Sequence, residues 1–395
     1  MFKWRNSCVG ECVGWVARFQ LLAVALSIGA SAGFVAAQVD LTTEHLQSAA
    51  DLIRKGQLSQ AEAKLNLVFK REPREANALN LLGVIRAQQR RPREAEALFL
   101  RAIEANKSLL GAYLNIAQLY LQLGERKRAE QFFSAALEIK PDDVPILQAL
   151  ANIARADGEP EKALSYLVRA RQIAPNAAAV LYDFGWTALK MNLLYDALVA
   201  LEQLHRMKVV DPSYLYPLAI ARLNNGQATE AQALINQYIQ VRPRDGRGYY
   251  VLGAILYADR RFAEARTAFQ RSLTLLPYPD TEYYLGMIAH QQGNATEAIS
   301  RFRRALRSNP ANAAAHVALG TVLARQKDYK AARAELERAI ELDPKDQTAH
   351  YQLGLVYARL GEKDRSQSAF AVSEKLRAEQ KERQGVGVRL IDLPK

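Results

Sequence analysis

The sequence repeats itself with a period of 34 residues over most of its 395-residue length. When a repeat unit is numbered from residue 42, position 8 is glycine or alanine in all ten successive units. These residues are Ala49, Gly83, Ala117, Ala151, Gly185, Ala219, Gly253, Gly286, Gly320 and Gly354. A fixed period of this length is typical of stacked-repeat architectures, so it limits the chain to folds in which similar units follow one another in a row.

Two further positions recur in every unit. Position 20 is small: Ala61, Ala95, Ala129, Ala163, Ala197, Ala231, Ala265, Ala298, Ala332 and Ser366. Position 24 is large and apolar: Leu65, Phe99, Phe133, Leu167, Leu201, Ile235, Phe269, Phe302, Leu336 and Phe370. Only the step from Ala265 to Ala298 is 33 residues long. The pattern therefore predicts ten units that start near residues 42, 76, 110, 144, 178, 212, 246, 279, 313 and 347.

Each unit is predicted to be a pair of α-helices joined by a turn. Positions 4, 7, 8 and 11 share one face of a first helix, and positions 20, 24 and 27 share one face of a second helix. Small side chains at positions 8 and 20 let the helices cross closely, and the residue at position 24 fills the space beside the crossing. The turns often contain a glycine that tolerates a positive φ: Gly56, Gly124, Gly158, Gly226, Gly293 and Gly361. Proline at position 32 ends the second helix in seven units.

On these residues the chain resembles the tetratricopeptide repeat family from residue 42 to about residue 380. The resemblance implies an all-α fold, a right-handed α-solenoid of about ten helix-turn-helix repeats. One helix pair cannot bury its own apolar face, so neighbouring pairs stack and leave a curved inner surface. Residues 374–383 are strongly charged, as a terminal helix that faces water should be. Residues 381–395 are predicted to be a C-terminal tail.

The centre of the array departs from the pattern. Position 27 is usually small, but it is Leu204 in the fifth unit and Tyr238 in the sixth. Val209 stands where proline is expected, and Pro212 comes three residues later. Two interpretations are open: a change in stacking angle between units one to five and units six to ten, or ordinary variation that repacking absorbs.

The first 37 residues do not fit the repeat. Arg18 is followed by an uncharged stretch over residues 19–39, and small side chains precede Gln38. A basic start, an apolar centre and a small-residue site predict a secretory signal peptide over residues 1–37. The alternative is an uncleaved membrane anchor, because about 20 uncharged residues can span a bilayer. In both cases the basic flank stays in the cytoplasm and the repeats lie across the membrane.

Both cysteines, Cys8 and Cys12, lie within this leader. A chain cleaved near Ala37 contains no cysteine, which suits an oxidising compartment. No second Cys or His pair follows nearby, so no metal site is predicted. We therefore expect an exported protein in the bacterial periplasm, with secretion or an inner-membrane anchor facing the periplasm as alternatives.

The chain carries a formal net charge of +12. A basic surface suits nucleic acid, anionic lipid, acidic polysaccharide or acidic protein. Export removes the repeats from the cytoplasm and so argues against nucleic acid. Contact with the membrane is expected only if residues 1–37 are retained.

No catalytic pattern is found in the sequence. There is no zinc-protease motif, no phosphate-binding glycine loop and no G-x-S-x-G nucleophile motif. His316 and His350 form a pair at position 4 of successive units, which is a packing position on the first helix. The repeats also leave few residues for a separate catalytic domain. The sequence therefore predicts a protein that is not an enzyme and that uses no cofactor.

Aromatic residues mark a candidate binding surface. In the family that the chain resembles, positions 2, 5, 9, 12 and 13 of the first helix line the inner groove. In this chain these positions hold Tyr182, Trp186, Tyr216, Tyr250, Tyr257, Tyr283, His290 and Tyr351. Tyrosine offers flat apolar area and a hydroxyl at low rotamer cost, which suits an extended peptide and also sugar rings. The alternative is that these rings pack between neighbouring units.

The first units lack this ladder, since Asn80, Leu114 and Gln148 stand at position 5. Leu114 and Gln118 also occupy two places where some family members use Lys and Asn to hold a C-terminal carboxylate, so that mode is not supported. Three hypotheses follow: an exported scaffold that binds an extended partner protein in envelope assembly or secretion, a polysaccharide-binding module, and a membrane-tethered assembly factor.

Overall fold

The computed structural model describes residues 41–276 and 279–385. The predicted signal peptide, residues 1–37, lies outside the described residues. The chain divides into two compact units, Met1–Val209 and Val210–Lys395, which we call the N-terminal and C-terminal lobes. The division falls in the segment where the sequence pattern is irregular. Each lobe is described by itself.

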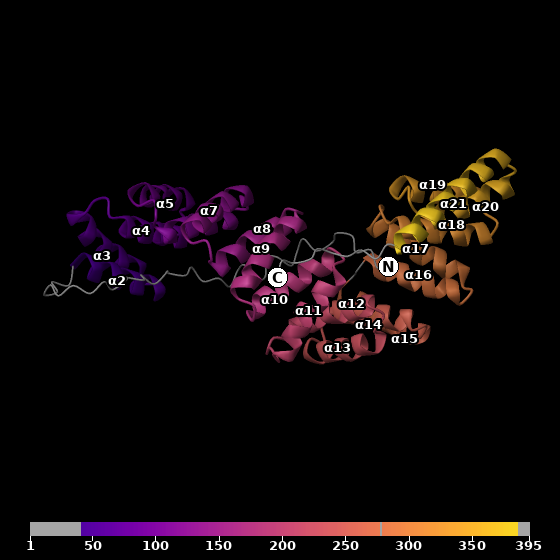
Figure 1. Cartoon of the computed structure of the whole chain (residues 1–395), viewed down its shortest axis with the longest axis horizontal. Helices are drawn as coiled ribbons and strands as arrows, with labels where there is room; N and C mark the ends of the chain where they lie inside the picture. The colour runs from indigo at the N-terminus through magenta and orange to yellow at the C-terminus, as the bar shows by residue number, and fades with distance from the viewer. Residues whose placement is uncertain (1–40, 277–278, 386–395) are drawn as a thin grey trace. The chain divides into compact units, whose positions relative to one another are not determined.

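Both lobes consist of antiparallel helix pairs (Figure 1). In the N-terminal lobe the pairs are α2 (Leu41–Arg54) with α3 (Leu58–Arg71), α4 (Ala76–Gln88) with α5 (Pro92–Ala105), α6 (Leu110–Gln122) with α7 (Arg126–Ile139), α8 (Val144–Ala156) with α9 (Pro160–Ile173), and α10 (Ala178–Lys190) with α11 (Leu194–Arg206). The even-numbered member is the first helix of each repeat.

The C-terminal lobe continues the same order. Its pairs are α12 (Leu215–Asn224) with α13 (Ala228–Val241), α14 (Gly246–Ala258) with α15 (Phe262–Leu275), α16 (Pro279–Gln291) with α17 (Ala295–Ser308), α18 (Ala313–Arg325) with α19 (Tyr329–Leu342), and α20 (Gln347–Leu360) with α21 (Lys363–Gly385). The described residues contain no strand, and the predicted all-α repeat solenoid is confirmed.

Side-chain caps and prolines start many of the helices. The Asp346 carboxylate accepts hydrogen bonds from the backbone N–H groups of Thr348 and Ala349 at 2.8 and 3.0 Å, where α20 begins. Such a cap satisfies donors that have no partner within the helix. Pro92 and Pro160 occupy the first position of α5 and α9, where a missing N–H does no harm. The starts of the helices are thus encoded locally.

The turn inside each repeat has a recurring backbone conformation. At position 15 the six glycines predicted to lie in the turns have φ between 75° and 80°. Four other repeats reach a similar conformation without glycine, with φ of 59° at Arg90, 62° at Asn192, 59° at Arg260 and 66° at Lys327. The turn geometry is therefore kept even where the residue is not glycine.

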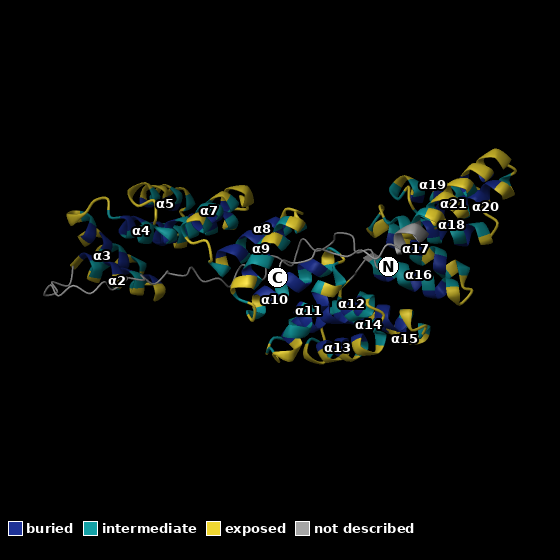
Figure 2. Cartoon of the chain, in the orientation of Figure 1, coloured by how far each residue is buried: buried dark blue, intermediate teal, exposed yellow. Residues whose placement is uncertain are grey.

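The core lies where the two helices of a pair cross. The structure places the small residues of the repeat signature in this core: Gly83, Ala95, Ala129, Gly185, Gly253, Ala265, Gly286, Ala298, Gly320, Ala332 and Gly354 are all buried. A β-carbon on Gly286 would lie 2.6 Å from the ring of Phe302. Figure 2 shows the buried residues on the sides of the helices that meet and exposed residues at the turns.

The irregular centre has a distinct local structure. Instead of a full first helix, the sixth unit begins with a 3₁₀ turn over Pro212–Tyr214, and α12 follows from Leu215. Leu204 and Tyr238, the large residues at position 27, are both buried. The irregular residues are thus absorbed within their own lobes. A change in stacking angle at this point stays a prediction.

The end of the array extends further than predicted. α21 continues to Gly385, so the boundary placed after residue 380 is wrong. The charged run from residue 374 is the continuation of the second helix of the last repeat, and not a separate cap. Among the described residues, no helix combines the length and the apolar character that a membrane span requires.

Candidate protein-binding surface

First helices of consecutive repeats touch each other along both lobes. In the N-terminal lobe, the Asn115 amide of α6 donates a hydrogen bond of 2.9 Å to the Asn80 side chain of α4. In the C-terminal lobe, Arg325 of α18 lies 3.3 Å from the His290 ring nitrogen Nε2 of α16. These contacts make the exposed sides of successive first helices into one surface in each lobe, which we call the first-helix face.

The first-helix face of the N-terminal lobe is rich in amides. Position 9 holds the amides Gln118 and Asn152 in successive repeats and Trp186 in the next one, and all three side chains are half-buried. Amide groups both donate and accept hydrogen bonds, as the backbone of an extended peptide does. From the sequence alone, Gln118 stands out only as a mismatch to a carboxylate clamp, and this row is not predicted. The signal that could have identified it is the recurrence of amides at positions 5 and 9.

A half-buried acidic group joins two of these repeats. Asp183 of α10 accepts a hydrogen bond of 3.2 Å from Gln148 and lies 3.2 Å from a guanidinium nitrogen of Arg155, both in α8. Burial raises the pKa of the Asp183 carboxyl, although Arg155 and Gln148 favour its charged form. This contact fixes α8 against α10 and orients the amide row.

Tyr182 and Trp186 complete this face at α10. Both side chains are half-buried. The ammonium group of Lys190 lies 5.2 Å from the centre of the Trp186 ring, close enough for a cation–π interaction. The structure therefore places these two aromatic residues beside the amide row, where part of each ring is accessible.

Two tyrosines of the predicted ladder are core residues. Tyr216 is only 5% exposed and Tyr250 only 2% exposed. The Tyr216 ring packs against Tyr238 at 5.6 Å, and the Tyr250 ring meets Phe269 at 5.8 Å. The assignment of Tyr216 and Tyr250 as partner-binding residues is therefore wrong. The physical reason is that each ring fills the space beside a bulky residue of the second helix.

The other aromatic residues of the C-terminal lobe are more accessible, yet they also pack. Tyr257 is half-buried against Phe262 and Tyr284, each at 5.5 Å, and burial raises the pKa of its hydroxyl. The Tyr283 ring lies 5.3 Å from Tyr284. Burial, with the nearby Tyr257 and Asp280, raises the pKa of Tyr283 to about 12. Tyr257 and Tyr283 thus belong to an aromatic cluster and leave only part of each ring to a ligand.

The last two predicted contact residues differ from each other. His290 is half-buried, and burial together with Arg325 lowers the pKa of its imidazole. Tyr351 in the last repeat is 45% exposed. The exposed aromatic rings do not form a continuous row, because Tyr216 and Tyr250 interrupt it. The described residues therefore offer no continuous tyrosine ladder along which sugar rings could stack.

The two histidines at position 4 lie between repeats. His350 Nε2 lies 3.0 Å from the carbonyl oxygen of Pro344, and His316 Nε2 lies 3.1 Å from that of Pro310. Each histidine thus contacts the proline that ends the preceding second helix. These contacts fit the packing role expected at position 4.

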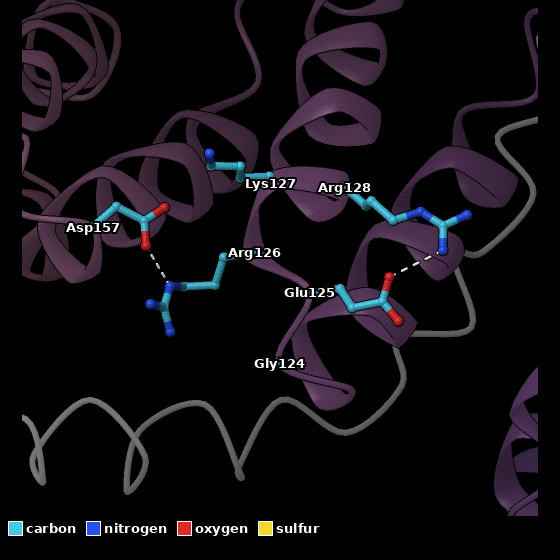
Figure 3. Close-up of a pocket in the computed structure, with 6 residues that line it drawn as sticks. All are labelled: Gly124, Glu125, Arg126, Lys127, Arg128 and Asp157. Atoms are coloured by element: carbon cyan, nitrogen blue, oxygen red, sulfur yellow. Dashed lines mark hydrogen bonds and ion pairs between the residues drawn. The ribbon is translucent and has the colours of Figure 1, made fainter.

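A small surface hollow lies beside the turn between α6 and α7 (Figure 3). Its volume is about 280 Å³, and it is lined by Gly124, Glu125, Arg126, Lys127, Arg128 and Asp157. Arg126 pairs with Asp157, and Arg128 pairs with Glu125 at 3.0 Å. Small-molecule sites are mostly apolar and enclosed. Since the charged groups here are exposed and largely paired with one another, the hollow does not form such a site.

Within residues 41–276 and 279–385, no group of three or more His, Cys, Asp or Glu side chains is placed to hold a metal ion. The candidate site is therefore the first-helix face and the aromatic cluster next to it.

Comparisons with known proteins bear on this surface. A family model of the tetratricopeptide repeat matches residues 46–109, 216–278, 283–346 and 328–374. A second model of the same repeat matches residues 86–153. Protein O-mannosyl-transferase TMTC3 of Homo sapiens is 24% identical over 253 residues, which cover 63% of this chain and 24% of that protein. Anaphase-promoting complex subunit 3 of Schizosaccharomyces pombe is 30% identical over 107 residues, 26% of this chain and 16% of that protein.

The chain spans about a quarter or less of the length of these two relatives. Among solved structures, the crystal structure of the APC/C hetero-tetramer Cut9–Hcn1 superposes with a TM-score of 0.54 and 16% identity. The superposition covers 76% of this chain and 59% of the chain in the solved structure. This likeness concerns the fold alone. The family matches together cover more than half of the chain, which therefore belongs to the tetratricopeptide repeat family of protein-interaction scaffolds.

Proposed function

We propose that this protein is a non-enzymatic scaffold that is exported across a membrane and holds an extended segment of a partner protein on its first-helix face. The observation that carries the proposal is the row of Gln118, Asn152 and Trp186, one residue from each of three successive repeats. Repeats of equal length present such groups at regular intervals, and an extended peptide presents its backbone groups at regular intervals too.

The chemistry of the face supports a peptide as its ligand. Amide side chains hydrogen-bond the backbone of a peptide with any sequence, and a tryptophan contributes a large apolar contact area. The name of the Schizosaccharomyces pombe relative describes a subunit of a complex. From it we carry over only the class of partner, which is another protein.

The place of action rests on the sequence of residues 1–37. Their basic start, apolar centre and small-residue end support export, and cell-envelope assembly or secretion are the settings we propose. The mass of the mature protein from its native host tests this part. A chain that starts near Gln38 supports a cleaved leader, whereas an intact Met1 contradicts it.

Site-specific photo-crosslinking in the host tests the binding face. A photoreactive residue at Gln118 or Trp186 should form covalent adducts with a partner protein. The matched control is Leu100, which is exposed on the second helix α5. Equal adducts from Leu100, or none from Gln118 and Trp186, would refute the proposed face. Trp186→Ala should weaken partner binding by about 1–2 kcal/mol, which isothermal titration with the identified partner measures.

A further inference from the structure

The last repeat exposes an apolar face that is covered in the repeats before it. The Tyr351 and Phe370 rings lie 5.6 Å apart, on α20 and α21. Tyr351 is 45% exposed and Leu355, one turn further along α20, is 41% exposed. We call Tyr351, Leu355 and Phe370 the terminal face.

The same pair of rings occurs in the seventh repeat, where it is covered. Tyr250 and Phe269 stand at the positions of Tyr351 and Phe370, and their rings lie 5.8 Å apart. There, Tyr284 from the next first helix, α16, stacks on Phe269 at 5.1 Å and meets Tyr250 edge-on at 6.1 Å. The terminal face thus has the geometry of a surface that receives a helix.

The exposure of the terminal face is a property of the last repeat alone. In all nine earlier repeats the bulky residue at position 24 is buried, whereas Phe370 is only half-buried. Position 9 shows the same contrast, since Ala254 is buried and Leu355 is exposed. Within the described residues, no further first helix follows α20 and α21 to cover this face.

The N-terminal end of the array has a polar outer side. The side of α2 that would face a preceding repeat carries Glu44, Ser48 and Asp51 at positions 3, 7 and 10. In α6 the same positions hold the buried Ala112, Ile116 and Leu119. A polar outer side is what a terminal repeat needs for solubility. In the part of the chain that the structure describes, the first repeat has one and the last repeat does not.

We propose that the terminal face binds an amphipathic α-helix of a partner protein, in the place where the first helix of an eleventh repeat would lie. The face continues the series of interfaces between repeats, and each of these interfaces holds a helix with an apolar side. The helix would carry an apolar or aromatic residue where α16 carries Tyr284. This proposal differs from peptide binding by Gln118, Asn152 and Trp186, which lie in the N-terminal lobe, so the two proposals can fail independently.

A second copy of the chain fits this face less well. The α2 helix of another copy would present Glu44, Ser48 and Asp51 to an apolar surface. A two-fold pair would place the same side of two α20 helices against each other, whereas successive first helices in the array meet through different sides. The internal interfaces therefore favour a helix from a different protein.

A helical peptide with the sequence of residues 280–292 is a suitable probe, because it carries Tyr284 in its natural surroundings. The peptide is labelled with fluorescein and stabilised by a side-chain link on its polar side. Its fluorescence anisotropy is measured as the full-length protein is added. We expect saturable binding that weakens at least tenfold in Tyr351→Asp and in Leu355→Glu. Val372→Asp is the matched control, since Val372 is 40% exposed on the outer side of α21, and its affinity should be unchanged.

Several results would overturn the proposal. One is a lack of saturable binding of the peptide to the wild-type protein. Another is that Leu355→Glu binds the peptide as tightly as the wild type, since this variant changes an exposed residue and keeps the Tyr351–Phe370 contact. Self-association in analytical ultracentrifugation that Leu355→Glu abolishes would assign the face to a second copy. The probe peptide could also bind only after Leu390 and Ile391 of the full chain are both replaced by Asp. That result would assign the face to residues 386–395. Photo-crosslinking from Gln118 should be the same in Tyr351→Asp, which separates this test from that of the first-helix face.

Discussion

The ring of Phe269 occupies the space that a β-carbon on Gly253 would need, since its Cδ1 atom lies 2.7 Å from that position. Gly253 belongs to α14 and Phe269 to α15, so the contact sets how closely the two helices of the seventh repeat cross. The same relationship joins Gly83 with Phe99 and Gly354 with Phe370. Helix spacing in these repeats is therefore fixed by one small and one large residue.

Gly253→Ala should destabilise the protein by about 1–3 kcal/mol, because the added methyl group overpacks the crossing. Urea unfolding followed by circular dichroism measures the change. Gly253→Ala combined with Phe269→Leu should recover part of the loss, since leucine leaves more room than the ring. Equal stability of Gly253→Ala and the wild type would show that the crossing adjusts without strain.

Lys327→Gly should stabilise the protein by about 0.5–1 kcal/mol. Lys327 has a φ of 66°, a conformation that glycine adopts without the steric penalty of a β-carbon. Gln326→Gly is the matched control, because Gln326 has a φ of −78° and gains nothing from glycine. Thermal unfolding of the three proteins tests the prediction, which fails if Lys327→Gly unfolds at a lower temperature than the wild type.

The ion pair between the first two repeats should make stability depend on pH. Arg86 donates two hydrogen bonds to Glu62, of 2.6 and 2.9 Å, and this contact holds the pKa of the Glu62 carboxyl below its ordinary value of 4.5. Stabilisation from a lowered pKa is complete above the ordinary value and is lost as the pH falls through the pKa of the folded state.

Glu62→Gln should therefore destabilise the protein by about 1 kcal/mol at neutral pH, with allowance for solvent screening. The difference from the wild type should shrink as the pH falls below about 4. Glu341→Gln provides the control, since its pair with Arg338 is exposed. Urea unfolding at several pH values measures both variants, and a difference that grows in acid contradicts the role of Glu62.

Tyr250→Ala should reduce stability by about 3–5 kcal/mol, because it leaves a cavity among Phe269 and Tyr284. Tyr250→Phe should cost about 1 kcal/mol, since it removes the hydrogen bond between the Tyr250 and Tyr284 hydroxyls. Tyr195→Ala is the exposed control, with a change of about 0.5 kcal/mol or less. Thermal unfolding distinguishes these outcomes, and a fully stable Tyr250→Ala would restore Tyr250 as a surface residue.

The fold follows from the sequence almost entirely, because the residues that recur are the residues that pack. The first helices α4, α6, α8 and α10 begin at residues 76, 110, 144 and 178, as the period predicts. The exception is the sixth unit, where Pro212 starts a 3₁₀ turn and the α-helix begins three residues later. A proline at that place alters the local hydrogen bonding, which a period alone does not describe.

The binding surface was harder to predict, because one helical position can face either a ligand or the next repeat. Tyr250 and Tyr351 share position 5, yet one is buried and the other exposed. The difference comes from Tyr284, which covers Tyr250, whereas among the described residues no such ring covers Tyr351. A pattern read within one repeat cannot include what the neighbouring repeat contributes.

The hydrogen bond from Asn115 to Asn80 joins residues only 35 apart in the sequence. When contacts are this local, little loop-closure entropy opposes them, and folding is fast for the length of the chain. Each repeat can form once its own residues and those of a neighbouring repeat are free to pack. This locality has a consequence for the export proposed above: a chain that crosses a membrane unfolded can begin to fold on the far side at any repeat, and folding can spread along the chain in either direction.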